Sequence, residues 1–356
     1  MAVEPDPFEP PQWQGAALSM RMASARVRAA ARRSVAVADL RLDEEHRLTE
    51  RIRFDVTARL RLLVETTARD LLRQVERLTD DGGVAATLLP HDRLVERLRQ
   101  AGCLTDPDLI DELVAQVRLT LLAEALPVEN VAGDAPSLLV RLTEAPDRIV
   151  AAAARAVLIA EGRGRITGQP DEAVALPAEL QQRLVWIVAA ALRQQDDAAL
   201  DTALAQAVER VLAAQDASER PLAAALRLAA AIDARASELP ELLVESLLNR
   251  QPGLFIALLV HATGIDADLM REIVLEPEGD RLWLVLRALD LDRATVARIG
   301  LSLCEADGRR DVEGFADALD GIVAVSAEEA RRATATLRLP RSFRAAMERL
   351  EGLARR

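Results

Sequence analysis

Apolar residues recur at intervals of three and four along most of this chain, which is the spacing of one face of an α-helix. Alternation of apolar and polar residues, the pattern typical of strands, is missing. The pattern therefore predicts an all-α fold. Its clearest case is a single long helix from Leu48 to Leu78, whose expected buried stripe consists of Ile52, Val56, Leu60, Leu63, Thr67, Leu71, Val75 and Leu78.

Prolines, glycines and changes in composition divide the chain into four parts. Residues 1–16 are rich in proline and acidic residues, and we expect a disordered tail there. Residues 17–80 predict a helical hairpin that a second subunit could double into a four-helix bundle, because the stripe of the long helix exceeds what one partner helix covers. Residues 86–236 and 238–356 predict two successive sets of helical repeats, with the glycine-rich stretch 162–168 as a linker.

Short helices with strong start and stop signals fill the stretch from Gln251 to Glu305. Gly264 is placed to end a helix in the left-handed conformation, and Asp266 and Asp292 are placed as N-caps. Pro277 requires a turn between them. Helices this short need neighbours that cover their apolar faces, so the pattern predicts a stacked helical array.

Two further helix starts are marked by capping residues. Thr105 and Asp108 form a T-x-x-D arrangement with Pro107 in the first turn. Ser326 and Glu329 form a capping box, from which we expect the last helices to close the array.

One motif in the second half of the chain resembles a known family. The stretch GIDADLMREIVLEPEGDRLWLVLRALDLD, preceded by Leu254 and Phe255, resembles the C-terminal signature of a bacterial family of HEAT-like helical-repeat proteins that is known only as a domain of unknown function. LPAELQQRLVWIVAAALR, from Leu176, resembles the mid-domain helix of that family. The resemblance implies a HEAT-like array of short antiparallel helices, in which the structural signature residues are Leu254, Phe255, Gly264, Glu276, Pro277, Gly279 and Arg287.

The composition excludes many enzyme classes. The net charge is -12, aromatic residues make up 2%, tyrosine is absent, and every basic residue is arginine. A chain without lysine has no phosphate-loop, kinase or Schiff-base lysine. Cys103 and Cys304 are too far apart in sequence for a zinc-binding pair, and we therefore expect no metal site. Two cysteines without a disulfide framework are typical of a reducing compartment, so we expect a cytoplasmic protein. We also expect no cofactor. The longest apolar run, Leu184 to Leu192, is too short to span a membrane.

Candidate chemistry rests on three histidines. His91 precedes Asp92 at a helix start, and His261 lies in a last helical turn, where it can interact with the helix dipole. His46 lies just before the long helix, and it resembles in this position the phospho-accepting histidine in the dimerisation hairpin of sensor kinases. One hypothesis is therefore that His46 accepts phosphate. A capping or surface role is the alternative for His46.

The N-terminal helix concentrates positive charge. Between Ala17 and Ala38 there are five arginines and no acidic residue, although the whole chain is acidic. These residues either form a solvated face or bind an acidic protein partner, whereas nucleic acid is disfavoured by the global charge. They are the candidate interaction residues of this sequence: Arg21, Arg26, Arg28, Arg32 and Arg33.

Three hypotheses for function follow from the sequence. The first is a non-enzymatic scaffold or adaptor, in which the helical repeats bind an unidentified protein partner. The second is a signalling element that forms a homodimer through residues 17–78 and exchanges phosphate at His46. The third is an enzyme of a class that the sequence does not identify.

Overall fold

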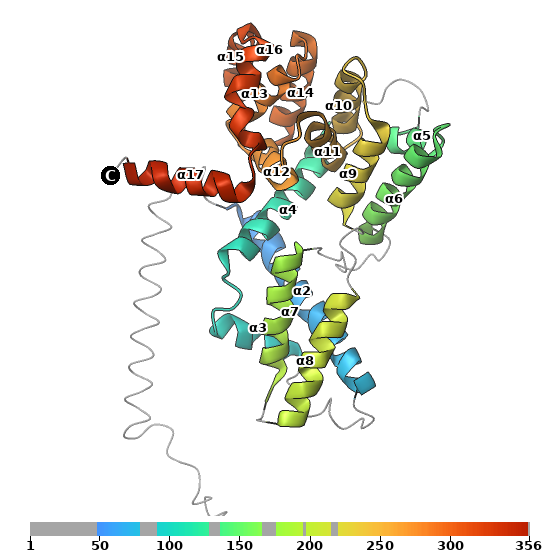
Figure 1. Ribbon diagram of the computed structural model, residues 1–356, viewed down its shortest axis with the longest axis vertical. Coiled ribbons are helices and arrows are strands. Elements are labelled where there is room, and N and C mark those ends of the chain that lie inside the picture. The colour runs from blue at the N-terminus through green and yellow to red at the C-terminus, as the bar shows by residue number, and fades with distance from the viewer. Residues whose placement is uncertain are drawn as a thin grey trace, which may run out of the picture. The chain divides into compact units, whose positions relative to one another are not determined.

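The computed structural model describes residues 48–78, 91–127, 136–165, 176–194, 197–214 and 220–354. Every regular element in these ranges is a helix, which confirms the predicted all-α fold class (Figure 1). None of the described helices contains a stretch that is both long and apolar enough to cross a lipid bilayer. The first helix of the hairpin predicted over residues 17–80 lies outside the described residues, so the hairpin stays a prediction.

The long helix predicted from Leu48 to Leu78 is present as α2, Glu50–Leu78. It belongs to a group of helices that also contains α3 (His91–Gln100), α4 (Pro107–Ala125), α7 (Ala178–Leu192) and α8 (Ala198–Ala213). α7 packs on both α3 and α8. α2 is connected to α4, because Arg59 Nη2 donates a hydrogen bond to Thr120 Oγ1 at 2.9 Å and Arg51 pairs with Glu124 at 2.6 Å.

The stripe of α2 is covered within a single chain. Six of its eight predicted positions are buried, and only Leu60 and Leu78 are half-exposed. A second subunit is therefore not needed to cover this stripe, which removes the reason for expecting dimerisation through it. Dimerisation through residues 17–78 stays a prediction without structural support.

A second group of helices shares one continuous hydrophobic core. The last turns of α4 join this core through Leu122 and Leu126. The other helices of the group are α5 (Leu138–Thr143), α6 (Arg148–Arg165), α9 (Pro221–Ile232), α10 (Leu239–Leu248), α11 (Pro252–Thr263), α12 (Ala267–Leu275), α13 (Asp280–Ala288), α14 (Arg293–Ala306), α15 (Val312–Ala324), α16 (Ala327–Ala333) and the 3₁₀ helix η4 (Ala335–Arg338). α17 (Arg341–Ala354) follows them.

The packing order of the second group differs from its order in sequence. α5 packs on α6, α6 on α9, and α9 on α11. α7 and α8 lie between α6 and α9 in the sequence but pack on each other, away from that pair (Figure 1). Helices far apart in the sequence are thus neighbours, and α5 and α6 together form one end of this series.

Local capping explains where several helices begin and end, as the sequence predicts. Gly264 ends α11 with φ 70°, a conformation that is open to glycine without strain. Asp266 and Asp292 cap α12 and α14, and their carboxylates accept hydrogen bonds from first-turn backbone N–H groups. Ser326 and Glu329 form the predicted capping box of α16.

Two local predictions are wrong. α4 is capped by Asp106, because its carboxylate accepts from the N–H groups of Asp108 and Leu109 while Pro107 occupies the first turn, so Thr105 is not the cap. α6 continues through Gly162 to Arg165, where we predicted a linker. Gln251 Nε2 donates to Glu161 Oε2 at 3.1 Å, and such tertiary contacts outweigh the weak helix propensity of glycine.

Candidate interaction site

The family signature residues belong to the second helix group, some in its core and some at its turns. Leu254 and Phe255 of α11 are fully buried in its core. Glu276 ends α12, and its two carboxylate oxygens share the Nε–H of Arg281, at 3.2 and 3.0 Å, across the turn that contains Pro277. These residues hold α12 and α13 at a fixed turn, which is a structural role.

Arg287, in the R-A-L part of the signature, is a buried arginine that binds carbonyl groups. Its Nε and Nη2 donate to Val325 O at 3.1 and 3.0 Å, and its Nη1 donates to Leu291 O at 2.5 Å. Val325 is the residue that ends α15. One guanidinium therefore connects α13 to the carboxyl end of α15, satisfying carbonyls that a helix end leaves without partners.

Gly279 begins α13 in a crowded place. Its φ is 72°, and a Cβ added there would lie 2.7 Å from the ring of Trp283 and 2.9 Å from Nη1 of Arg310. The Arg310 guanidinium lies over the Trp283 ring at 5.8 Å from its centre. Glycine is needed at this position both for its backbone conformation and for this close approach.

Arg310 is buried with unsatisfied hydrogen-bonding groups. Its Nη2 donates to Val274 O at 2.6 Å, whereas its Nε and Nη1 have no hydrogen-bond partner. Burial, together with the charge of Arg309, lowers the pKa of Arg310, although Asp307 opposes this effect. Arg309 itself pairs with Asp307 at 2.6 Å. The cluster holds the α14–α15 turn against the end of α12.

Replacing Arg310 by Met is expected to change the free energy of unfolding by no more than about 1 kcal/mol. The variant loses the hydrogen bond to Val274 and the contact with Trp283. This loss is offset because the desolvation cost of burying two nitrogens without hydrogen-bond partners is removed as well. Arg310→Ala should cost about 2–4 kcal/mol, because it leaves a cavity. Urea unfolding of both variants tests this expectation, and a Met variant as unstable as the Ala variant would contradict it.

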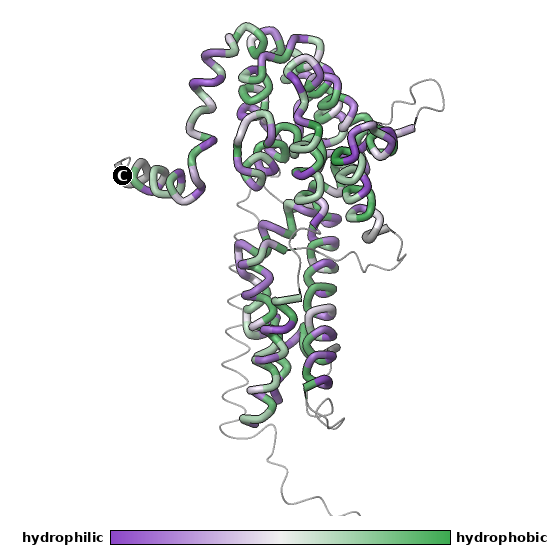
Figure 2. Tube along the Cα trace, turned by 45° about the vertical axis from the view of Figure 1, so that its right-hand side comes forward, coloured by the Kyte–Doolittle hydropathy of each residue, from purple (hydrophilic) through white to green (hydrophobic). Residues whose placement is uncertain are grey.

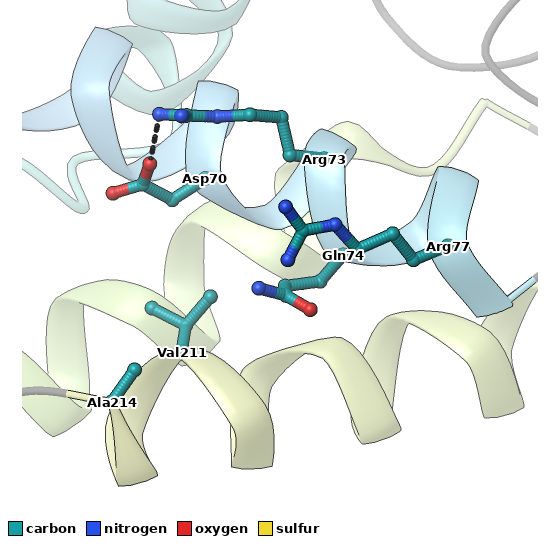
Figure 3. Close-up of a pocket in the computed structure, with 6 residues that line it drawn as sticks. All are labelled: Asp70, Arg73, Gln74, Arg77, Val211 and Ala214. Carbon is teal, nitrogen blue, oxygen red and sulfur yellow. Dashed lines mark hydrogen bonds and ion pairs between the residues drawn. The ribbon is translucent and has the colours of Figure 1, made fainter.

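A shallow pocket of about 260 Å³ lies between α2 and α8 (Figure 3). From α2, Gln74 and Arg77 extend toward it, whereas Arg73 points along the helix to Asp70. Val211 of α8 and Ala214, directly after that helix, line the other side. Arg73 is paired with Asp70 at 2.5 Å, and both side chains are largely exposed. Exposed arginines on one helix face, one of them already paired, do not define a site for a particular ligand.

The histidines and cysteines do not form a reactive centre within the described residues. His261 lies in the last turn of α11, as predicted, and its Nε2 is 2.9 Å from Oδ1 of Asp233, the residue that ends α9. His91 begins α3, as predicted, and His46 lies outside the described residues. Cys103 and Cys304 are free thiols, and burial raises the pKa of Cys304. No metal-binding cluster occurs in the part of the chain that the structure describes.

The outer face of α6 is the candidate interaction site. Four residues at helical spacing form what we call the α6 stripe: Ile149, Ala152, Ala156 and Ile159. Ile149 is 70% exposed and Ile159 is 57% exposed. The opposite face of the helix is buried through Val150, Ala154 and Val157. α6 is thus apolar on the side that faces away from the core as well as on the side that faces it.

Arginines border the α6 stripe. Arg148 and Arg155 are exposed, and each directly precedes a stripe position along the helix. Arg155 Nη2 donates a hydrogen bond at 2.9 Å to the backbone carbonyl of Thr143, which is the last residue of α5. This contact holds the Arg155 side chain beside the α6 stripe. Val140 of α5 is a further exposed apolar residue, at 39%. The site therefore combines an apolar strip with positive charge along one border.

The five arginines proposed from the sequence as an interaction surface, Arg21, Arg26, Arg28, Arg32 and Arg33, lie outside the described residues. Sequence reasoning did not find the α6 stripe. The isoleucines stand in an apolar helix, AAAARAVLIA, in which periodicity alone does not show which residues the neighbouring helices leave uncovered. The exposed face of α6 depends on how this helix packs between α5 and α9, which is a property of the fold.

The described residues define an all-α protein. A sequence profile of the family DUF2336, described as an uncharacterised protein conserved in bacteria, matches residues 144–338, which is more than half of the chain. The chain belongs to this family, which confirms the resemblance identified from the signature residues. Neither the curated proteins nor the solved structures contain a match to the sequence.

Proposed function

We propose that this protein is a non-enzymatic interaction scaffold, and that the α6 stripe binds an amphipathic helix of another protein. The supporting observation is the exposure of Ile149 and Ile159 on α6, which together with α5 forms one end of the packed series α5, α6, α9 and α11. Terminal helices of repeat arrays need polar outer faces to stay soluble. An apolar outer face at such an edge is typical of a surface that a partner covers.

The chemistry of the stripe indicates what the partner carries. Ala152 and Ala156 in its centre allow a helix to approach closely, and Ile149 and Ile159 at its ends would contribute about 1–2 kcal/mol each if a partner covered them. Arg148 and Arg155 favour acidic residues along one border of the partner helix. An acidic amphipathic helix fits both features.

A second copy of the chain fits the stripe less well. If the α6 helices of two chains packed antiparallel about a two-fold axis, each border of the α6 stripe would lie against the same border of the second chain. Arg155 would then face the same residue of the second chain, and like charges across an interface are unfavourable. The charge pattern therefore favours a different protein as the partner.

Replacing Ile149 and Ile159 together by Glu is expected to abolish capture of this partner. The tagged full-length chain would be used to capture proteins from its bacterial host, and mass spectrometry would identify those lost with the double variant. The two introduced glutamates place one charge at each end of the α6 stripe. They remove the apolar packing surface and leave unpaired carboxylates in the interface. Far-UV circular dichroism should be unchanged, because both side chains are exposed.

Phe54→Glu is a matched control, since Phe54 is an exposed apolar residue, 74% accessible, on α2. The control should retain the same captured protein. Equal capture by the wild type, the control and the double variant would contradict the proposal, and so would a captured protein whose binding depends on Phe54.

The proposal assigns the scaffold to the cytoplasm. Cys103 and Cys304 are free thiols, and thiols persist in a reducing compartment. Whether the arginines between Ala17 and Ala38 also bind an acidic partner stays a prediction. The signalling and enzymatic hypotheses also stay predictions.

A further inference from the structure

α17 is an amphipathic helix whose apolar face is uncovered. Along Arg341–Ala354, the residues Phe343, Ala346, Met347 and Leu350 recur at spacings of three and four. Phe343 is 55% exposed and Leu350 is 68% exposed. In both views the helix lies apart from the other helices, and it packs extensively on none of the described ones (Figures 1 and 2).

The connection to α17 is short and ordered. Only Leu339 and Pro340 separate it from η4. Phe343 N and Arg344 N donate to Pro340 O at 3.0 and 3.1 Å, and Arg344 Nε donates to Leu339 O at 3.2 Å. These hydrogen bonds order the turn through which α17 follows η4. A short hinge of this kind favours exchange of the helix between two chains.

The surface of the α14–α15 pair offers complementary properties. α15 carries acidic residues and no basic residue, and Glu313 and Asp317 are exposed on it. Beside them Val312 and Ala316 are exposed at a spacing of four. On α14, which packs against α15, Leu301 is 41% exposed and is followed one turn later by exposed Glu305. The pair therefore presents apolar residues with an excess of carboxylates around them, although α14 also carries the exposed Arg298 and Arg293, which pairs with Asp320 of α15.

The charge of α17 is opposite. Arg341, Arg344 and Arg349 lie in the helix, and the sequence after it ends in two further arginines, against only Glu348 and Glu351. In a chain with a net charge of -12, this segment is locally basic. The apolar face of α17 is bordered by arginines, whereas the apolar residues of the α14–α15 pair have carboxylates beside them. The two surfaces are therefore complementary in charge.

We propose that α17 of one chain docks on the α14–α15 surface of a second copy, and that the second copy returns its own α17 in the same way. One 14-residue helix alone would bury less surface than the roughly 1,200–2,000 Å² of a stable interface. A two-fold axis makes the contact twice, which doubles the buried area. The surface and the partner differ from those of the α6 stripe.

The oligomeric state of the full-length protein tests this inference. Sedimentation equilibrium should show a dimer, and raising the salt concentration should weaken it, because opposite charges meet in the interface. Phe343→Glu combined with Leu350→Glu should raise the dimer dissociation constant at least about 30-fold, because both anchors are lost. Asp317→Arg should weaken the dimer through the docking surface, with α17 unchanged.

Cross-linking identifies the two surfaces. Chains carrying Ala316→Cys are mixed with chains carrying Ala346→Cys, both with Cys103→Ser, and treated with a short bismaleimide. We expect covalent dimers between the two kinds of chain, and far fewer between identical chains. The Ile149→Glu and Ile159→Glu variant should dimerise as the wild type does, so failure of the α6 proposal is distinguishable from failure of this one.

Three outcomes would overturn the inference. The first is a wild-type protein that is monomeric at every concentration. The second is a dimer unaffected by loss of Phe343 and Leu350, or cross-linked through Ala346 of both chains. The third is a monomer whose α17 binds vesicles that contain anionic lipid, which would assign the basic apolar face to a membrane surface.

Discussion

Replacing Glu112 by Gln is expected to lower the free energy of unfolding by about 3–5 kcal/mol. Glu112 of α4 is 8% exposed, and its carboxylate binds both terminal nitrogens of Arg271 in α12, at 3.0 and 2.5 Å. Burial lowers the pKa of Arg271, but the hydrogen bond and charge of Glu112 outweigh this effect and raise it. Removing the carboxylate leaves a largely buried cation whose remaining ion pair, with the exposed Asp268 at 3.6 Å, is longer.

The matched control for Glu112 is its neighbour Asp111, which is exposed. Asp111→Asn should change the stability by less than about 0.5 kcal/mol. The double variant Glu112→Leu with Arg271→Met should recover most of the loss, because an apolar pair of similar volume removes both desolvation costs. Urea unfolding of the three variants measures these differences. A Glu112→Gln variant as stable as the Asp111→Asn variant would show that the pair does not hold α4 to α12.

Replacing Gly300 by Ala is expected to lower the free energy of unfolding by about 2–3 kcal/mol or more. A Cβ at this position in α14 would lie 2.0 Å from Cζ of Phe315 in α15. The Phe315 ring cannot move away easily, because it packs on Trp283 with ring centres 4.7 Å apart. Either the ring must leave its position or the two helices must separate, and both changes disrupt a close-packed core.

Gly321 provides the control for Gly300. It lies in the interior of α15, and no atom is within 4 Å of an added Cβ there. Gly321→Ala should therefore stabilise the protein by about 0.5–1 kcal/mol, through helix propensity and a less flexible unfolded chain. Adding Phe315→Leu to Gly300→Ala should restore part of the lost stability, because the smaller side chain makes room for the Cβ. Opposite signs for the two glycine variants in thermal unfolding are the result that the packing predicts.

Local signals in the sequence were sufficient to predict the helical fold and several helix boundaries. Asp266, Asp292 and Ser326 act within one helical turn of themselves, so their capping roles can be read without knowledge of the fold. The buried stripe of α2 follows from helical spacing in the same way. The signature residues also identified the family, although their structural roles, such as that of Arg287, required the packed structure.

Long-range contacts account for what the sequence did not predict. Glu112 and Arg271 are 159 positions apart, and nothing near either residue indicates that they pair. The same is true of Arg310, whose partner carbonyl belongs to another helix. The α6 stripe escaped prediction because its exposure depends on α6 packing beside α9, with two intervening helices located elsewhere. Residues that are apolar in sequence become a candidate site only when the fold leaves them uncovered.

The most direct test of the central proposal is the affinity of the captured partner for the α6 stripe. Isothermal titration calorimetry would compare the purified partner with the wild type and with the Ile149→Glu and Ile159→Glu variant, at matched salt concentration. We predict that the dissociation constant of the double variant is at least about 100-fold larger than that of the wild type, and that Phe54→Glu leaves it unchanged. Equal affinity for the wild type and the double variant would contradict the assignment of α6 as the binding surface.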